Sequence, residues 1–198
     1  MKHLRLLLVS MLLFFCLFAF CKDTVKVEIK PSFQIYFVDE KINVLDKTLS
    51  EKIEEIKLCK EPALTEKDIK AYHWTTHTIE LTKEGVDRLK KMIVYGKPEG
   101  EEIQRKDLWS KGMNKVFVVV VNGKRAYLGR TTSMLSSYIS SFPSIDISWL
   151  DPDKAMIVND TDMPENSIRI EKMMKDDEED VREQEWIKDA LEELKILK

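Results

Sequence analysis

The feature that most constrains the fold is an unbroken apolar run over residues 116–121. A row of β-branched and aromatic residues is typical of a strand that is buried on both faces. Asn122 and Gly123 follow directly, and this pair tolerates the positive φ angles of a type I′ turn. We therefore expect the chain to fold straight back through residues 125–128, which makes a central β-hairpin over residues 115–129.

The N-terminus has the composition of a targeting segment. A short basic region over residues 1–5 precedes an almost wholly apolar run over residues 6–20. Ala19 and Cys21 supply small residues at the two positions that a signal peptidase recognises. We therefore interpret residues 1–21 as a cleaved signal peptide.

Two alternatives to this cleavage stay open. Cys21 stands where a lipoprotein would be acylated, although Phe20 is bulkier than the residue that usually precedes a lipidated cysteine. The third interpretation is an uncleaved anchor, but the apolar run is shorter than the roughly 20 residues that span a bilayer. All three interpretations place the rest of the chain outside the cytoplasm, either in the periplasm or secreted. In each, contact with a membrane is confined to the N-terminal segment.

Charge divides the remaining chain into two parts. Residues 22–150 contain 22 basic and 19 acidic side chains, whereas residues 151–198 contain 8 and 16. This asymmetry predicts an α+β domain over residues 22–150 and an acidic C-terminal extension with a long helix over residues 151–198. Neither part has a dense cluster of basic and aromatic residues, which disfavours nucleic-acid binding.

Apolar patterns predict further elements before the hairpin. Alternation indicates strands near residues 24–30 and 33–38, and either an edge strand at 42–45 or a short helix at 49–57.

Threonines mark two helix starts in the same half of the chain. The hydroxyl of Thr65 is expected to accept an amide of a short helix, and residues 73–80 are expected to be extended. Thr82 should cap a longer helix that buries Ile93 and ends at Gly96.

After that helix, residues 97–114 form a polar insert with Leu108 and Trp109 as anchors. Residues 130–143 are compatible with a short helix, and residues 145–147 suggest a strand.

The acidic extension is expected to contribute an edge strand at residues 155–158 and a helix over residues 176–198. The apolar stripe of that helix comprises Val181, Ile187, Ala190, Leu191 and Leu194.

No catalytic motif or cofactor-binding motif is present in the sequence. His73 and His77 are four residues apart, but their threonine-rich context favours a strand, where that spacing separates them by about 13 Å. We therefore interpret them as ordinary surface or cross-strand histidines and predict no metal site. The serines between residues 133 and 148 lack a Gly-x-Ser-x-Gly motif. Cys59 has no disulfide partner within the mature chain and is expected to be a partly buried apolar residue.

The segment after the hairpin has a composition that suits contact with a polypeptide or envelope partner. Tyr127, Arg130, Tyr138 and Phe142 combine aromatic surface and positive charge with many neighbouring hydroxyls. These residues are the candidate partner-binding set, although a crossover whose aromatics pack against the domain is the simpler alternative.

Three short motifs in order resemble the first periplasmic domain of SecD, the accessory subunit of the bacterial Sec translocase. They are Pro-Ala-Leu-Thr at residues 62–65 followed by Asp-Ile at 68–69, Leu-Thr-Lys-Glu-Gly at 81–85, and the apolar strand and turn at 116–123. Glu66 departs from the glycine that the family usually has. The resemblance implies an α+β fold with helices on one face of a mixed or antiparallel sheet, and contact with polypeptides outside the membrane. It does not extend to the motor activity of SecD, because no later membrane-spanning segment follows.

We therefore expect a non-enzymatic, extracytoplasmic binding module with a C-terminal helix and no cofactor. Two alternatives remain, namely an envelope hydrolase that uses serine and histidine, and a small-ligand carrier with an apolar pocket beside the hairpin.

Overall fold

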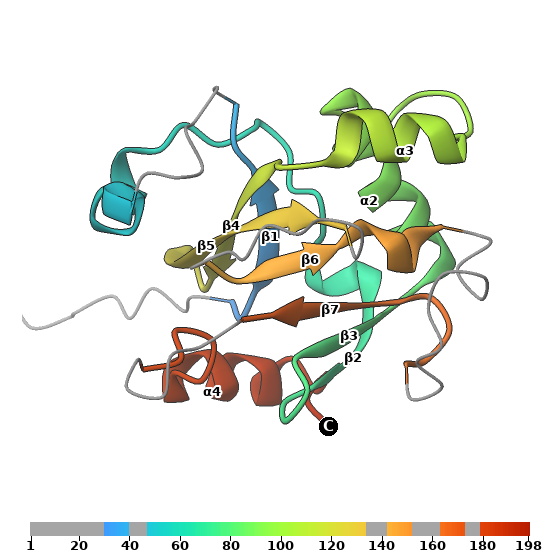
Figure 1. Ribbon diagram of the computed structural model, residues 1–198. Helices are drawn as coiled ribbons and strands as arrows, with labels where there is room; N and C mark the ends of the chain where they lie inside the picture. Colours follow the sequence, from blue (N-terminus) through green and yellow to red (C-terminus); the bar gives the residue numbers. More distant parts are fainter. Residues whose placement is uncertain (1–29, 40–46, 134–141, 152–162, 173–178) are drawn as a thin grey trace, which may run out of the picture. The chain divides into compact units, whose positions relative to one another are not determined.

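The hairpin expected from the apolar run is the centre of the fold. The computed structural model describes residues 30–39, 47–133, 142–151, 163–172 and 179–198 (Figure 1).

Within that hairpin, β4 (Val116–Val121) and β5 (Lys124–Thr132) pair antiparallel. Asn122 and Gly123 join them with φ angles of 52° and 76°, as a type I′ turn requires. All of β4 is buried, so the predicted two-sided burial is confirmed.

In the described part of the chain, seven strands form one mixed sheet in the order β1-β4-β5-β6-β7-β3-β2 (Figure 1). The strands other than β4 and β5 are β1 (Phe33–Phe37), β2 (Ile69–His73), β3 (Thr78–Leu81), β6 (Ser144–Asp146) and β7 (Ser167–Glu171). The β5–β6 pair is parallel and the other neighbouring strands are antiparallel. The predicted α+β class with a mixed sheet is confirmed.

The sheet curls into a half-barrel. Phe33 of β1 and Tyr72 of β2 belong to the two outermost strands, yet their ring centroids are only 5.7 Å apart. The outer edge of β1 is met by residues 63–64, because Leu64 forms an antiparallel bridge with Ile35. The curl therefore gives the sheet an inner face on which apolar residues from both ends meet.

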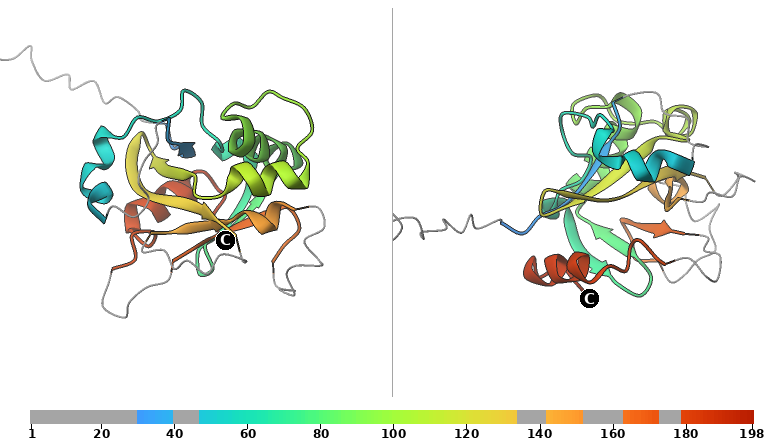
Figure 2. Two further views of the ribbon diagram at one scale, coloured as in Figure 1. Left: turned by 45° about the horizontal axis from the view of Figure 1, so that its top comes forward. Right: turned by 90° about the vertical axis from the view of Figure 1, so that its left-hand side faces the viewer.

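The α-helices of the described residues are α2 (Lys83–Tyr95), α3 (Arg105–Gly112) and α4 (Glu185–Glu193). Their buried side chains join the inner-face core of the sheet, as the prediction of helices on one face requires. Figures 1 and 2 show α2 and α3 at one end of the half-barrel and α4 at the other end.

The outer face of the hairpin has its own smaller core. Val118 and Val120 alternate with the inner-face residues of β4 and pack against Leu49 and Ile56. Leu49 belongs to the 3₁₀ helix η1 (Lys47–Glu55), so a short helical segment covers this face. Of the two predictions for residues 39–60, the helix near 49–57 is confirmed in 3₁₀ form, whereas residues 40–46 lie outside the described residues.

Several predictions from local sequence features are confirmed. Thr82 caps α2 by accepting a hydrogen bond of 2.9 Å from the amide of Gly85, and Gly96 ends the helix with φ of 71°. Leu108 of the insert is buried in α3. Ile187 of α4 is buried with its predicted neighbours Ala190 and Leu191. The predicted N-cap Thr65 does precede a short helix, the 3₁₀ helix η2 (Glu66–Asp68), and Asp68 Oδ2 accepts hydrogen bonds from the Thr65 amide over 2.8 Å and the Thr65 hydroxyl over 2.9 Å.

Other local predictions were wrong. Residues 73–80 are not one extended segment, because residues 74–77 form the turn between β2 and β3. The helix expected from residue 176 begins at Glu185.

The region after the hairpin also differs from its prediction. The start of the helix expected over 130–143 is strand, because β5 continues to Thr132. The strand expected at 145–147 is β6, and it gives way at Ile147 to the 3₁₀ helix η3 (Ile147–Leu150).

Some predicted elements lie outside the described residues, namely the leader over 1–21, most of the strand near 24–30, and the edge strand at 155–158. Among the residues that are described, no helix combines the length and the apolar character needed to cross a lipid bilayer.

The acidic C-terminal extension is part of the central sheet and is not an appendage to it. Its strand β7 lies between β6 and β3 in the interior of the sheet. Residues 196–198 pair in parallel with β2, with hydrogen bonds of 2.7 Å from the amide of Tyr72 to the carbonyl of Ile196 and 2.9 Å from the amide of Lys198 to the carbonyl of Tyr72. Residues 31–198 accordingly form one compact unit.

Candidate functional site

The turn between β2 and β3 holds an aromatic and imidazole cluster. His77 adopts φ of 48°, and its ring lies 5.7 Å from that of Trp74 and 6.0 Å from that of Tyr72. Tyr72 Oη and His77 Nδ1 are 2.9 Å apart, within hydrogen-bond distance. Only 3% of His77 is exposed, so this hydrogen bond fixes a buried imidazole.

The loop before α4 adds a buried ion pair to the same region. Arg182 Nη2 donates to Asp180 Oδ2 over 2.5 Å, and Arg182 Nε lies 2.9 Å from Asp180 Oδ1. Arg182 Nη1 also donates to the carbonyl of Ile170 in β7. The guanidinium therefore holds Asp180 with the bidentate geometry that suits arginine and ties the loop to β7 through one further hydrogen bond.

Burial and this ion pair set the protonation of the cluster. Burial and the nearby positive charge of Arg182 together lower the pKa of His77 to about 4, so the imidazole is neutral at pH 7. Burial alone would raise the pKa of Asp180, but hydrogen bonds from Arg182 outweigh it and hold that pKa below its ordinary value. Burial also raises the pKa values of Tyr72 and Tyr127, so both phenols stay protonated.

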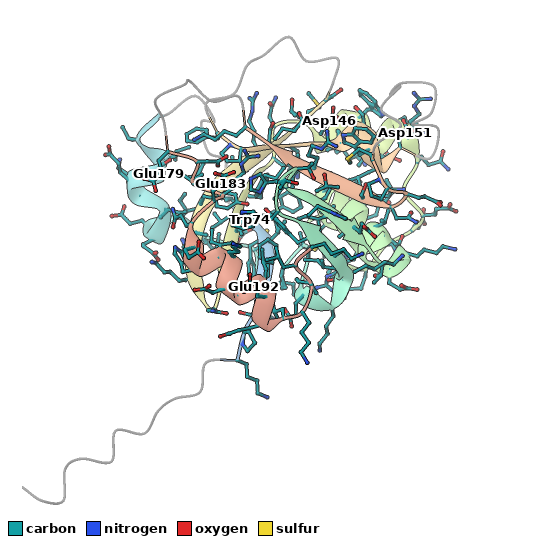
Figure 3. All side chains as sticks on the ribbon, turned by 90° about the horizontal axis from the view of Figure 1, so that it is seen from below. Trp74, Asp146, Asp151, Glu179, Glu183 and Glu192 are labelled. Atoms are coloured by element: carbon teal, nitrogen blue, oxygen red, sulfur yellow. The ribbon has the colours of Figure 1, made fainter. Side chains whose placement is uncertain are left out.

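A second carboxylate, that of Glu183, faces the Nε2 side of the imidazole. His77 Nε2 lies 3.8 Å from Glu183 Oε1, beyond hydrogen-bond distance, and has no hydrogen-bond partner in the described part of the chain. His77, Asp180 and Glu183 each offer a ligand atom within 4.8 Å of the others. Figure 3 shows Glu183 and Trp74 on the side of the molecule where α4 lies.

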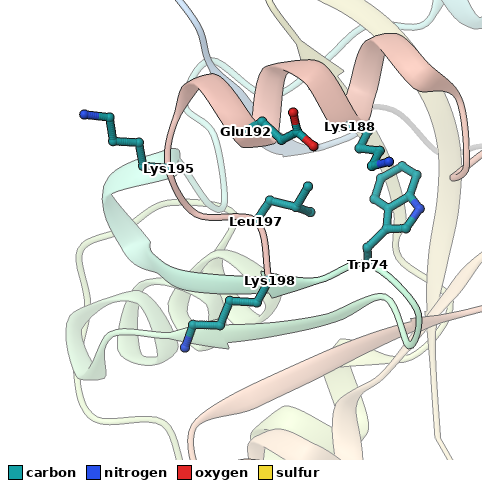
Figure 4. Close-up of a pocket in the computed structure, with 6 residues that line it drawn as sticks. All are labelled: Trp74, Lys188, Glu192, Lys195, Leu197 and Lys198. Atoms are coloured by element: carbon teal, nitrogen blue, oxygen red, sulfur yellow. The ribbon is translucent and has the colours of Figure 1, made fainter.

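A surface hollow of about 550 Å³ opens beside this cluster, and we call it the α4 hollow (Figure 4). Its lining residues are Trp74, Lys188, Glu192, Lys195, Leu197 and Lys198. Trp74 and Leu197 supply the apolar surface, and three lysines face a single glutamate. The wall from α4 and residues 195–198 exists because the chain end pairs with β2.

The partner-binding set expected from the sequence lies elsewhere. Tyr127 and Arg130 are buried, with 4% and 3% of each residue exposed. Phe142 is partly buried and packs against the outer-face core of the hairpin. Tyr138 and the candidate lipidation residue Cys21 lie outside the described residues. A partner at the surface would therefore meet neither Tyr127 nor Arg130 without a rearrangement.

The remaining candidate residues have ordinary surroundings. His73 Nε2 lies 2.5 Å from Glu80 Oε1 across the β2–β3 pair, and Cys59 is partly buried against the inner core. Within the described residues, the two histidines make polar contacts with Tyr72, Glu80 and Glu183, and no serine is among these partners. The arrangement that an envelope hydrolase would need is not found there.

Sequence reasoning missed Asp180, Arg182 and Glu183 because they belong to an acidic run that resembles a solvated helix start. One weak signal was present, since Arg182 is the only basic residue between Lys175 and Lys188. Nothing in the local sequence indicates that this arginine reaches the carbonyl of Ile170, because that contact depends on the placement of β7.

Comparison with known proteins gives the chain no assigned relatives: no family model, no curated protein and no solved structure matches it. The resemblance to SecD stays a prediction.

Proposed function

We propose that the chain is a non-enzymatic, extracytoplasmic binding module that holds an acidic polypeptide segment in the α4 hollow. The observation that supports this function is the pairing of an apolar surface from Trp74 and Leu197 with the positive charges of Lys188, Lys195 and Lys198. The extracytoplasmic location rests on the composition of residues 1–21.

The lining favours a polypeptide that carries both acidic and apolar side chains. Tryptophan is enriched at protein interfaces because a large apolar ring can be buried at little cost in conformational entropy. The lysines add long-range attraction for acidic segments, which raises the rate of association and weakens at high salt. A volume of about 550 Å³ accommodates a few side chains, so the hollow suits a short segment.

The position of the hollow bears on the small-ligand carrier, and the positions of three motifs bear on the resemblance to SecD. The hollow lies beside the β2–β3 turn and not beside the β4–β5 hairpin, where a small-ligand carrier was expected to have its pocket. The three motifs shared with SecD fall at η2, at the start of α2 and in β4, and they support a further proposal that this is a relative of its first periplasmic domain.

A peptide-binding measurement tests the function. Lys195→Glu combined with Lys198→Glu should weaken the binding of acidic, leucine-containing peptides by about tenfold or more, because two attractive charges become repulsive. The matched control is Lys67→Glu with Lys83→Glu, which makes the same change in net charge on two exposed lysines outside the hollow.

Fluorescence anisotropy should show weaker binding for the hollow variant alone, and peptides with lysine in place of glutamate should not bind. An equal loss in both double variants would mean that net charge acts without a specific site. No difference between either variant and the wild type would contradict the proposal.

A further inference from the structure

We propose that His77, Asp180 and Glu183 form a binding site for a divalent zinc ion, which joins the β2–β3 turn to the loop before α4. The site lies next to the α4 hollow but is independent of it, since none of the three residues lines the hollow.

The spacing of the ligand atoms suits one ion. Zinc binds imidazole nitrogen and carboxylate oxygen at about 2.0–2.2 Å in tetrahedral geometry, so two ligand atoms on one ion lie about 3.3–3.6 Å apart. His77 Nε2 and Glu183 Oε1 are 3.8 Å apart, close to this spacing. The whole set lies within 4.8 Å, so the ligand atoms must move closer together to share one ion, and the Glu183 side chain is 58% exposed and free to move.

The His77 imidazole is already oriented for metal coordination. Its Nδ1 is held by Tyr72 Oη, and this outer hydrogen bond is the usual way in which a protein orients a metal-binding histidine. Its Nε2 is buried and has no hydrogen-bond partner in the described residues, which is costly for a polar atom unless a ligand completes it.

Arg182 is compatible with the ion as an outer partner of Asp180. The two carboxylates and one guanidinium leave a net charge of about −1, which favours a dication. Both oxygens of Asp180 accept hydrogen bonds from Arg182, so coordination by one oxygen would replace part of this bidentate contact while the other oxygen keeps the guanidinium. Hydrogen-bonded carboxylates of this kind are common in metal sites. The open side at Glu183 leaves room for water as a fourth ligand.

The mixed donor set selects zinc over magnesium and calcium. One imidazole with two carboxylates suits zinc, whereas the two hard cations prefer oxygen ligands alone. An ion at this position would fasten the start of the α4 segment to the turn that carries Trp74, and so would stiffen one wall of the hollow.

Calorimetric titration of the full chain with Zn²⁺ in chelator-treated buffer tests the site. We expect one ion per chain, together with a rise in Tm of several degrees at saturating Zn²⁺ and no effect of Mg²⁺. Glu183→Gln should weaken Zn²⁺ binding by about tenfold or more, because it removes a charge from a largely exposed side chain without changing its shape. His77→Asn should weaken it at least as much, since asparagine tolerates the positive φ and can reach Tyr72 but lacks the Nε2 ligand.

Two matched controls distinguish this site from adventitious binding. Glu193→Gln removes an exposed glutamate of α4, and His73→Gln removes the other histidine of the described residues. Both variants should bind Zn²⁺ like the wild type. The proposal is overturned if the wild type binds no Zn²⁺, if Glu183→Gln and His77→Asn bind it unchanged, or if the His73→Gln variant is the one that loses it. Because Glu183→Gln is expected to fold normally, a folding defect in His77→Asn leaves the test decisive.

Discussion

The two hairpins of the sheet are held together in different ways. The β4–β5 hairpin turns at Asn122 and Gly123, and every residue of β4 is buried among apolar neighbours. The β2–β3 hairpin turns through residues 74–77, and its turn rests on a buried polar cluster supplied largely by residues 180–183. The first hairpin is specified by its own sequence, whereas the second depends on a segment about 100 positions away along the chain.

This difference indicates that the first hairpin contributes mainly stability, whereas the second carries groups suited to binding. The apolar neighbours of β4 and the preferred turn stabilise the first hairpin. The second hairpin offers a buried imidazole nitrogen without a hydrogen-bond partner in the described residues and the partly buried Trp74 at the α4 hollow, which are features that a ligand can use. Variants that weaken each hairpin separately can break or sharpen this comparison.

The largest effect is expected from Arg182→Met, which removes the cation of the buried pair. Asp180 would remain buried without its partner, and the free energy of unfolding should fall by about 3–5 kcal/mol. Urea denaturation measures the loss. The double variant Asp180→Asn with Arg182→Met should recover part of it, because the buried charge is then also removed. A single variant as stable as the wild type would show that the second hairpin does not rely on this pair.

The next largest effect is expected from Gly129→Ala, which tests the packing of the β4–β5 hairpin. A Cβ at this position would lie 2.3 Å from Phe117 Cζ and 2.5 Å from the carbonyl oxygen of Pro143. The resulting overpacking should cost about 2–3 kcal/mol in unfolding free energy. Gly123→Ala is the matched control, since nothing lies within 4 Å of its Cβ and only its φ of 76° opposes alanine, at about 1 kcal/mol. Equal losses in the two variants would argue against tight packing at Gly129.

A smaller loss of about 1–2 kcal/mol is expected for Asn122→Ala. Alanine disfavours φ of 52°, and the change removes the Oδ1 acceptor that lies 2.9 Å from the amide of Ser32. Asn122→Asp keeps both the acceptor and the tolerance of positive φ, so its stability in thermal denaturation should lie closer to that of the wild type. If both variants matched the wild type, the turn would contribute little to the first hairpin.

The smallest effect has the opposite sign. Lys195 ends the α4 segment with φ of 59°, so Lys195→Gly should raise the free energy of unfolding by about 0.5–1 kcal/mol. The same variant removes one lysine from the α4 hollow, and it should therefore bind acidic peptides more weakly while unfolding at a higher Tm. A parallel loss of stability and binding would indicate that Lys195 supports the fold instead of the ligand.

The success of sequence reasoning follows the same contrast between the hairpins. The first hairpin, the cap at Thr82 and the stop at Gly96 were predictable because each depends on residues that are neighbours in the chain. The turn at residues 74–77 was predicted as strand, since threonine favours extended geometry until tertiary contacts override it. The burial of Tyr127, Arg130 and Arg182 could not be found in this way, because the inner face of the sheet exists only after distant strands have paired.

The interior position of β7 has a consequence for the order of folding. Thr78 of β3 pairs with Arg169 of β7, so the sheet contains contacts between residues far apart in sequence, and such contacts slow folding. Until residues 167–171 join, β3 and β6 each have an unpaired edge that can associate with other chains. We expect a chain that lacks residues 163–198 to fail to fold and to aggregate, whereas the intact chain passes through a period in which a chaperone that shields strand edges would protect it.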